Sequence, residues 1–491
     1  MSKATQVPSP DAHSSGPGSP DPSAKGGGVG SLVRTGIRIV VGAAATGGLL
    51  ALSMPPGRGG FLAWAALAPL LIAAAGTRFS VGFLGGVAAG LAAAGLSSAG
   101  WLYGGAPEPG RETGWIVIGF SVIGTTVGIV CGVWAELRGV RASHVALLAG
   151  AAVLLELLSL QILPVHLGLT QHEAPAWLLA ASATGIWGVS FAAWLSNLFL
   201  AALALRGRQT AASLTFVVLA GSSIMSWPRE EGTLLVAALQ CDSDDGRSLR
   251  ELTSRAGAQG ARLVVWPELS GNAFAAGGYD GGLAELSLTD ELPAFVTSFT
   301  DGTRPLPHNT ARLYHRGAGS APYRKRRLFG GERSQHAPGD RAVAVPWRGG
   351  ALGLNICFDS CFPALMRETA RLPGVSLIAL PAMGPDSVHG VVAAAHSAYT
   401  AFRAAELGVP IVSAELASHA AIFDRNGRAV ARATGRGGQV VSGGVAGEGN
   451  WTLYKAAGDW FLYGIALLSL ALSVVRLRAQ PPKKASNHTQ P

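Results

Sequence analysis

Three residues whose side chains could together transfer an acyl group lie in separate segments of the chain. Glu268 ends the run Val-Val-Trp-Pro-Glu, Lys325 lies in Tyr-Arg-Lys-Arg-Arg-Leu, and Cys357 lies in Leu-Asn-Ile-Cys-Phe-Asp. A thiol is a strong nucleophile once deprotonated, a carboxylate can take its proton, and an ammonium can stabilise the oxyanion formed when the thiolate attacks a carbonyl. The three side chains therefore predict acyl transfer through a thioester.

Lys325 is unusual because the chain relies on arginine for nearly all its positive charge. It is one of two lysines between Lys25 and Lys483, and three arginines stand beside it. Lysine carries a compact charge whose pKa moves readily on burial, and both properties suit a catalytic site. Each of the three residues alone is also consistent with a plainer role, as a basic loop, a strand-end carboxylate or a buried structural thiol. Their combination favours catalysis.

Other roles for the cysteines are weaker. Cys357 and Cys361 are four positions apart, and His389, His396 and His419 lie in the same part of the chain. A zinc site would need a second cysteine pair or closely spaced histidines, and neither accompanies them. A disulfide between the two cysteines would disable the nucleophile. We therefore predict no metal and no cofactor, and interpret His389 and His396 as polar surface or satisfied residues.

Composition indicates a membrane part and a water-facing part. The 491 residues are 49% hydrophobic and 14% charged, with a mean hydropathy of +0.33. This is too apolar for an ordinary soluble protein. The net charge of +9 is spread through short loops and tails, which argues against nucleic-acid binding. Residues 1–30 are rich in Pro, Ser and Gly and predict a disordered cytoplasmic tail. No signal-peptide cleavage site follows, so the first apolar stretch is expected to be retained.

Eight apolar stretches follow one another with short connections, apart from a long interval before the last. They cover 37–53, 60–76, 79–103, 114–136, 144–163, 177–205, 211–226 and 459–475. A bilayer core requires about 20 apolar residues. Lys and Arg are concentrated in every second connecting segment, as expected for cytoplasmic loops if the N-terminus is inside. We predict a membrane domain of about seven transmembrane helices at 31–227, an extracytoplasmic domain at 228–456, a transmembrane helix at 457–478 and a cytoplasmic tail at 479–491.

The extracytoplasmic domain has short apolar runs separated by Gly, Pro and Asp. Strands are predicted at 234–240, 263–266, 311–315, 342–347, 352–358, 376–380, 410–415, 421–424 and 439–445. Helices are predicted at 248–256, 364–371 and 391–407. Strands that alternate with helices indicate a layered α/β domain. Glu268 and Cys357 each end or follow a buried strand, where such sheets present their chemistry.

The order of the three motifs resembles the nitrilase superfamily. Trp-Pro-Glu at 266–268, Tyr-x-Lys-x-x-Leu at 323–328 and Ile-Cys-Phe-Asp at 356–359 match its Glu-Lys-Cys triad. The resemblance implies an αββα sandwich attached to a polytopic α-helical membrane domain. It also implies supporting roles for four further residues, with Glu332 as a second carboxylate near the lysine. These residues are Asn309, Glu332, Phe358 and Asp359.

The membrane segments narrow the resemblance to the apolipoprotein N-acyltransferase family. Residues 61–71, 166–171, 185–191 and 454–461 are similar to its membrane motifs, and the likeness spans about 45–475. The resemblance implies a multi-pass protein of the bacterial inner membrane with its catalytic domain on the periplasmic side. It further implies a phospholipid acyl donor, a diacylglyceryl apolipoprotein acceptor and no cofactor. We expect a monomer that works in the lipid bilayer and does not bind nucleic acid.

Four segments depart from the family pattern. Residues 241–245 lack the usual Asn-Ile-x-Gln and Lys-Trp, and the loop 328–332 is one residue shorter and lacks a proline. Phe358 and Asp359 replace tyrosine and glutamate, and Glu415 begins a run where Thr-Asn is typical. The triad remains, so these changes bear on substrate more than on reaction type. Two alternatives stay open: a membrane-anchored amidase or hydrolase that uses water, and an inactive relative that binds lipid or lipoprotein.

Overall fold

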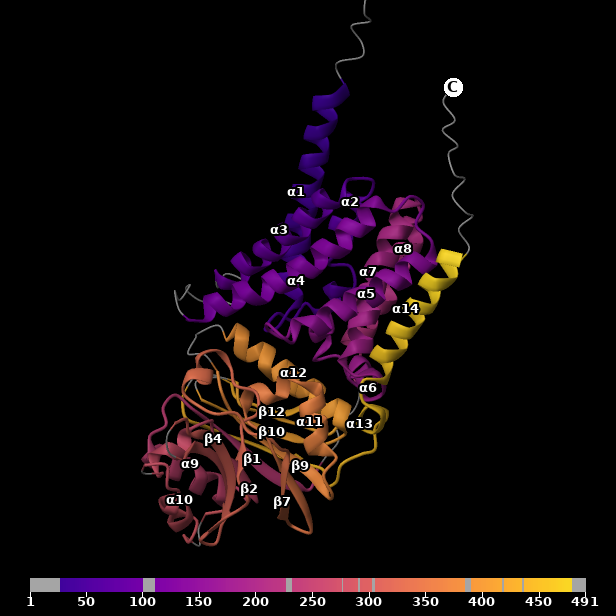
Figure 1. The fold of residues 1–491 in the computed structure, drawn as a ribbon. Coiled ribbons are helices and arrows are strands. Elements are labelled where there is room, and N and C mark those ends of the chain that lie inside the picture. The colour runs from indigo at the N-terminus through magenta and orange to yellow at the C-terminus, as the bar shows by residue number, and fades with distance from the viewer. Residues whose placement is uncertain are drawn as a thin grey trace, which may run out of the picture.

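The computed structural model describes residues 27–99, 111–226, 232–275, 277–289, 292–302, 305–384, 390–416, 419–434 and 437–478. Most of the N-terminal tail predicted to be disordered, and all of 479–491, lie outside these residues. An α-helical domain is built from the N-terminal part of the chain and from the last helix, and a layered α/β domain comes between them in sequence (Figure 1).

The helical domain consists largely of apolar helices. They are α1 (Gly27–Ser53), α2 (Ala68–Ala74), α3 (Phe79–Ser98), α4 (Arg111–Glu136), α5 (Ala142–Ser159), α6 (Pro175–Thr184), α7 (Ile186–Leu205), α8 (Gln209–Ile224) and α14 (Trp460–Arg478). Among the described residues, α1, α3, α4, α5 and α7 are long and apolar enough to cross a membrane. Large apolar side chains stay exposed on the outside, such as Leu32 and Val218. A surface of this kind suits lipid rather than water.

Two predicted stretches differ in the structure. The stretch 177–205 forms two helices, because Gly185 adopts a φ of +69° between α6 and α7. A Cβ atom at this position would lie 2.6 Å from the Tyr454 ring. The stretch 60–76 forms the 3-10 helix η2 (Gly60–Trp64) and the seven-residue α2. Neither element alone could cross a bilayer, so the count of seven spans stays a prediction.

The α/β domain contains one curled sheet with both parallel and antiparallel strand pairs. Its strands are β1 (Leu234–Cys241), β2 (Leu263–Val265), β3 (Ala294–Asp301), β4 (His308–His315), β5 (Ala318–Gly319), β6 (Tyr323–Arg324), β7 (Val343–Trp347), β8 (Gly350–Leu354), β9 (Val375–Met383), β10 (Ile411–Leu416), β11 (Ala421–Phe423), β12 (Ala429–Arg432) and β13 (Gln439–Val445). The order along the sheet is β5-β4-β3-β2-β1-β10-β9-β8-β7. The sheet folds back at the β1–β10 junction, where only Gln240 and Cys241 pair with Glu415 and Leu416.

The curl gives the αββα layers that the sequence predicts. Alternate residues of β1 point to opposite sides: Val236 and Ala238 join a core shared by both arms of the sheet, whereas Ala237 and Leu239 face an outer core. This alternation follows from the period of two in a strand. Helices α9 (Gly246–Ala258) and α10 (Gly281–Leu286) cover one outer face, and α11 (Pro363–Ala370) and α12 (Val391–Leu407) cover the other. The predicted fold class is confirmed.

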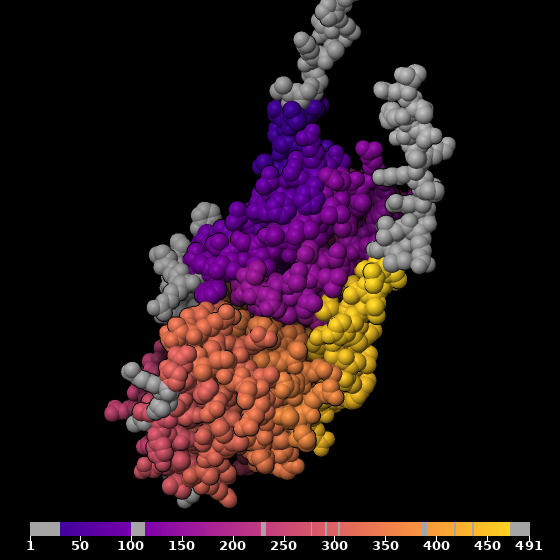
Figure 2. Space-filling model, viewed as in Figure 1, coloured from indigo at the N-terminus to yellow at the C-terminus, as the bar shows by residue number. Residues whose placement is uncertain are grey.

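Helix α12 also connects the two domains. One face of α12 packs on the sheet through Ala401 and Ala404, while Tyr399 and Phe402 belong to the core of the helical domain. At the far end of the interface, the Glu406 carboxylate accepts a hydrogen bond of 2.7 Å from the Ile186 amide at the start of α7. Figure 2 shows the α/β domain seated directly against the end of the helical domain. The interface between the two domains is therefore a packed apolar core that also contains a buried hydrogen bond.

Candidate active site

Glu268 is held at the point where the two arms of the sheet approach each other. It lies three residues after β2, and Trp266 anchors the segment by stacking on Phe295 of β3 with ring centroids 4.7 Å apart. The Glu268 amide donates a 3.0 Å hydrogen bond to the carbonyl oxygen of Ala382 in β9. These contacts fix the backbone, so the buried carboxylate has little freedom to move.

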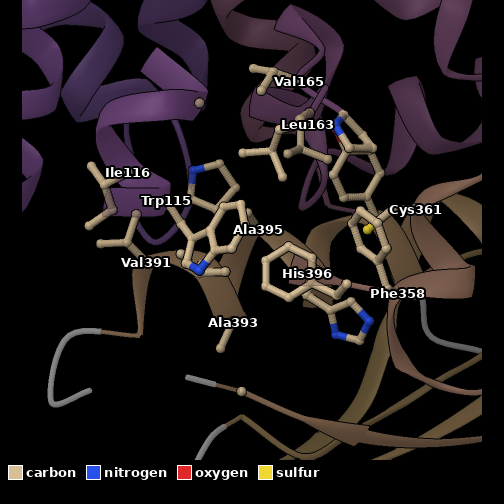
Figure 3. A pocket seen from close by; sticks show the side chains of 18 of the residues that line it. Trp115, Ile116, Leu163, Val165, Phe358, Cys361, Val391, Ala393, Ala395 and His396 are labelled. Atoms are coloured by element: carbon tan, nitrogen blue, oxygen red, sulfur yellow. The ribbon is translucent and has the colours of Figure 1, made fainter. Parts of the chain in front are cut away.

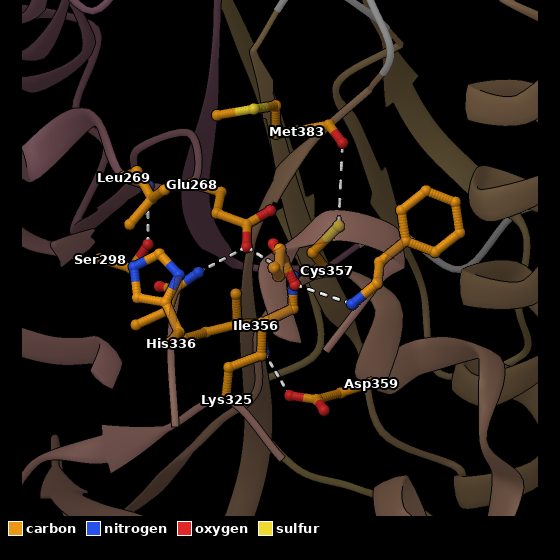
Figure 4. Close-up of polar contacts among 12 residues, drawn as sticks. Glu268, Leu269, Ser298, Lys325, His336, Ile356, Cys357, Asp359 and Met383 are labelled. Carbon is orange, nitrogen blue, oxygen red and sulfur yellow. Dashed lines mark hydrogen bonds and ion pairs between the residues drawn. The ribbon is translucent and has the colours of Figure 1, made fainter. Parts of the chain in front are cut away.

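Lys325 lies directly after β6 and reaches the same place. Its amide donates a 2.8 Å hydrogen bond to the Asn309 carbonyl oxygen of β4. Its Nζ lies 2.7 Å from Oε1 of Glu268 and 2.7 Å from Oε1 of Glu332, and its side chain is fully buried. The Asn309 side-chain amide donates a further 2.7 Å hydrogen bond to Oε1 of Glu268. The structure thus brings four of the predicted residues together, and Figure 4 shows Glu268 and Lys325 among them.

The electrostatics of this group keep the lysine charged. Burial alone would lower the pKa of the Lys325 ammonium, but the negative charges of Glu268 and Glu332 and the hydrogen bond to Glu268 outweigh it and hold the pKa well above its usual value. Burial raises the pKa of the Glu268 carboxyl group; the charge of Glu332 adds to this, and Lys325 opposes it. Glu268 is therefore a stronger base than an exposed carboxylate, which suits proton abstraction.

Cys357 faces these groups from the other arm of the sheet. It is the first residue of the 3-10 helix η6 (Cys357–Cys361) and has a φ of +46°, a strained value for a residue other than glycine. Its Sγ lies 3.8 Å from the Met383 carbonyl oxygen. Burial raises the pKa of the Cys357 thiol, and the charge of Glu268 adds to this. The cysteine thus rests as a thiol beside a base.

The two residues after the cysteine have structural contacts. The Asp359 carboxylate is buried and accepts hydrogen bonds from the Tyr323 hydroxyl (2.7 Å), the Arg327 amide (2.8 Å) and the Ile356 amide (3.0 Å). It thereby ties the lysine segment to the cysteine turn. The Phe358 ring packs edge-on against Phe329, with centroids 4.8 Å apart. Both predicted supporting residues position the site rather than contact the thiol through their side chains.

Although the loop 328–332 is shortened, the Glu332 carboxylate still reaches Lys325. Oε2 of Glu332 accepts a 2.8 Å hydrogen bond from the Phe329 amide, which closes the turn, while Oε1 contacts Lys325. The Phe329 ring packs on Trp115 of α4 with centroids 4.4 Å apart. Gly330 has a φ of +51°, and a Cβ atom there would lie 2.9 Å from the same indole. Glycine therefore allows this loop to lie directly on the helical domain.

His396 is a site residue that the sequence did not reveal. Its Nε2 lies 2.9 Å from the Cys357 carbonyl oxygen, and its Nδ1 lies 3.0 Å from Oε1 of Glu415 in β10. The sequence suggested a polar or satisfied histidine, and the structure places it behind the nucleophile. Glu415 had appeared only as a departure from the family pattern. The alanine-rich sequence around His396 gives no sign of a partner 19 positions further along the chain.

An apolar cavity of about 140 Å³ opens beside Cys357, between the two domains. Helix α4 and the segment before the 3-10 helix η3 (Leu167–Gln171) form one side through Trp115, Leu163 and Val165 (Figure 3). The α/β domain forms the other side through Phe358 and Ala395. The helical domain therefore completes a site whose thiol, carboxylate and ammonium come from the α/β domain.

Metal and disulfide chemistry find little support in the described part of the chain. Among those residues, no group of three or more His, Cys, Asp or Glu side chains is arranged to hold a metal ion. All four cysteines are free, including Cys357 and Cys361. His389 lies outside the described residues. The geometry instead places a thiol, a carboxylate and an ammonium around one point.

Two family models match the chain, one for each domain. Residues 46–199 match the apolipoprotein N-acyltransferase N-terminal domain, and residues 235–446 match the carbon-nitrogen hydrolase domain. Among curated proteins, an (R)-stereoselective amidase from Pseudomonas sp. is 48% identical over 50 residues, which are 10% of this chain and 18% of that protein. The match thus spans less than a fifth of the length of this relative.

Solved structures of amidases also match. A crystal structure of an amidase from Nesterenkonia sp. is 20% identical, with a TM-score of 0.40, and the match covers 49% of this chain and 98% of that one. A cysteine-to-alanine mutant of the Nesterenkonia AN1 amidase, from the nitrilase superfamily, is 19% identical with a TM-score of 0.38, covering 50% and 100% of the two chains.

The two family models occur in the order helical domain, then α/β domain, and their boundaries agree with the two domains of the structure. The chain belongs to the apolipoprotein N-acyltransferase family of the nitrilase, or carbon-nitrogen hydrolase, superfamily.

Proposed function

We propose that the protein transfers an acyl chain from a phospholipid to the N-terminal amine of a diacylglyceryl-modified apolipoprotein, through a thioester on Cys357. The observation that carries this proposal is the apolar cavity beside the thiol, which is completed by helices of the membrane domain. An amidase for small polar substrates does not require an apolar cavity. An enzyme that binds a fatty acyl chain does, because burying each methylene of the chain is worth about 0.8 kcal/mol.

In the first half-reaction, Glu268 takes the proton from the Cys357 thiol. The sulfur attacks the ester carbonyl carbon of the phospholipid, and the carbonyl oxygen becomes an oxyanion. The Lys325 ammonium and the backbone amide at the start of η6 stabilise this oxyanion, since the first amides of a helix lack internal partners. The C–O bond then breaks, the lysophospholipid oxygen takes the proton from Glu268, and the acyl group stays on sulfur.

In the second half-reaction, the amine of the lipoprotein N-terminus attacks the thioester. Glu268 removes a proton from this amine, and the C–S bond breaks to give an amide and the free thiol. Lys325 serves the same oxyanion position in both steps, because the acyl carbon does not need to move. Glu332 and Asn309 hold Lys325 and Glu268 in place from the side away from the cavity.

We place the α/β domain on the periplasmic face of the bacterial inner membrane. The support is the sequence pattern of basic loops, which puts residues 228–456 outside the cytoplasm, together with the cavity at the boundary of the membrane domain. In this location both lipid substrates could enter from the outer leaflet. The substrates themselves are the acyl-bearing phospholipid and the diacylated cysteine; we propose no cofactor and a monomeric enzyme.

A second candidate is a hydrolase that passes the acyl group to water. The 50-residue similarity to an (R)-stereoselective amidase favours it, and so does the altered segment 241–245. The chemistry of the first half-reaction would be the same, since only the acceptor differs. The apolar cavity argues against an amidase for small polar substrates, and the match to the apolipoprotein N-acyltransferase N-terminal domain favours transfer over hydrolysis.

A reconstituted assay separates the two candidates. The purified full chain would be placed in phosphatidylethanolamine vesicles with a diacylglyceryl-cysteine peptide, and the products would be analysed by mass spectrometry. The proposal predicts a triacylated peptide and a lysophospholipid in equal amounts. Free fatty acid in place of triacylated peptide would support the hydrolase. The absence of both products would refute both and leave a lipid-binding, inactive relative.

A further inference from the structure

A buried histidine and glutamate lie directly behind the proposed nucleophile. His396 belongs to α12, and its side chain is 11% exposed; Glu415 belongs to β10, and its side chain is 1% exposed. Nδ1 of His396 lies 3.0 Å from Oε1 of Glu415, while Nε2 lies 2.9 Å from the Cys357 carbonyl oxygen. The Ser360 hydroxyl lies 2.9 Å from the same Nε2.

The partners of the ring determine where its protons are. A carboxylate oxygen and a carbonyl oxygen can only accept hydrogen bonds, so both ring nitrogens must carry a proton to satisfy them. A neutral ring protonated at Nδ1 could accept a hydrogen bond from the Ser360 hydroxyl, but it would still leave the Nε2 lone pair 2.9 Å from the Cys357 carbonyl oxygen. The doubly protonated ring satisfies both, and the Ser360 hydroxyl can then accept from Nε2 as well. The contacts thus indicate an imidazolium beside a carboxylate.

The charges around the ring favour the same state. Glu415 faces it from β10, Glu268 acts on it from the end of β2, and Cys357 and Cys361 face it from η6. The described residues that line this cavity from the helical domain, such as Trp115 and Val165, have no charged or titratable side chain. With a neutral ring, the carboxylates of Glu268, Glu332 and Glu415 would outnumber Lys325 by two. Burial alone would lower the pKa of His396, but the hydrogen bond and charge of Glu415 outweigh it and raise the pKa.

We propose that Glu415 keeps His396 protonated, and that this imidazolium positions Cys357 and stabilises its thiolate. Its hydrogen bond to the Cys357 carbonyl fixes the left-handed backbone, which has a φ of +46°. When the S–H bond breaks, the proton goes to Glu268, the electron pair stays on sulfur, and the imidazolium keeps both its protons. His396 is therefore a positioning residue that also supplies charge. Glu415 thereby has a role that an uncharged side chain at this position could not perform.

This inference rests on Cys357 being the nucleophile of the proposed function, but not on the acyl donor or acceptor. The inference can therefore be tested without the acyl donor or the acceptor. Iodoacetamide alkylates only the thiolate. The rate at Cys357 in the intact, detergent-solubilised chain, followed by peptide mass spectrometry between pH 5.5 and 8, reports how stable that thiolate is. Acyl-enzyme formation from phospholipid would be measured separately on the same samples.

Two variants distinguish charge from structure. In Glu415→Gln the imidazole loses its counter-charge and becomes neutral at pH 8. The variant also loses the Glu415 charge, which raises the pKa of the Cys357 thiol, but the ring lies between Glu415 and Cys357 and therefore acts at shorter range. Alkylation at pH 8 should be about tenfold slower than in the wild type, which corresponds to one pKa unit. At pH 5.5 the ring is protonated again and the Glu415 charge is absent, so the ratio to wild type should rise to one or above. In His396→Gln no imidazolium forms at any pH, so the deficit should persist at pH 5.5.

The matched control is Glu285→Gln, the same change at an exposed position of α10, which should follow the wild-type profile. A Glu415→Gln ratio that is constant across the pH range would overturn the inference, because a purely structural defect would act equally at every pH. A wild-type chain that shows the expected alkylation profile but forms no acyl-enzyme would contradict the proposed function and leave this inference standing.

Discussion

Replacing Lys325 by arginine tests whether the site needs an ammonium or only a positive charge. The Lys325 side chain is fully buried, and one nitrogen lies 2.7 Å from an oxygen of Glu268 and 2.7 Å from an oxygen of Glu332. A guanidinium is planar and spreads its donors, so it cannot put one nitrogen at that point and also direct a donor to the oxyanion. Losing one oxyanion donor costs about 2.7–4 kcal/mol, or about 100- to 1,000-fold in rate.

The assay is single-turnover formation of the acyl-enzyme from a phospholipid with a labelled acyl chain. Lys325→Arg should slow this step about 100- to 1,000-fold, while keeping the two carboxylates paired. Lys325→Met should be equally inactive and also less stable by about 3–5 kcal/mol, because it leaves buried carboxylates without a counter-charge. Thermal unfolding in detergent would measure this difference. A Lys325→Arg protein that acylates within threefold of the wild-type rate would refute the reasoning.

Three further predictions concern residues around the triad. Glu332→Gln removes a negative charge that raises the pKa of Glu268. The acid limb of the plot of kcat/KM against pH should therefore move to lower pH. No shift, or a shift to higher pH, would show that the charge of Glu332 does not raise the pKa of Glu268. Asp359→Asn replaces an acceptor of three hydrogen bonds by a group that accepts on one side only, so the free energy of unfolding should fall by about 1–3 kcal/mol, read from thermal unfolding. Ala395→Phe places a large ring in the cavity. Acylation of Cys357 by a long-chain phospholipid should then fall at least about tenfold, while iodoacetamide should still react with Cys357. Equal loss of both reactions would show that the variant distorts the site instead.

The site was predictable where residue type alone carries the chemistry. The triad is predicted from three residue types, from the positions of Glu268 and Cys357 at strand ends, and from the resemblance of the motifs to the nitrilase superfamily. The structure places Nζ of Lys325 2.7 Å from Oε1 of Glu268. Cys357 was expected at the end of a strand, but β8 stops at Leu354 and the cysteine begins a 3-10 turn. Hydrophobicity continues through this turn, so the apolar pattern could not mark where the strand ends.

The fold was predictable where strands are uniformly apolar, and β3 shows the limit. Thr297 and Ser298 are fully buried in its middle, and Ser298 accepts a hydrogen bond from the Leu269 amide. Their polarity hides the strand from a hydropathy pattern. The break at Gly185 was missed for the opposite reason, because both flanking segments are apolar. His396 and Glu415 became visible only through three-dimensional contact, since their positions are set by a helix and a strand that meet behind η6.

The most direct test of the central claim is to identify the acylated residue. The full chain would be incubated with a phospholipid of known acyl chain and no acceptor, digested, and analysed by mass spectrometry with and without hydroxylamine. We predict a single adduct on Cys357 with the mass of the acyl group. Hydroxylamine should remove this adduct, and the Cys357→Ala variant should not form it. An adduct on another residue, or one that persists in Cys357→Ala, would contradict it.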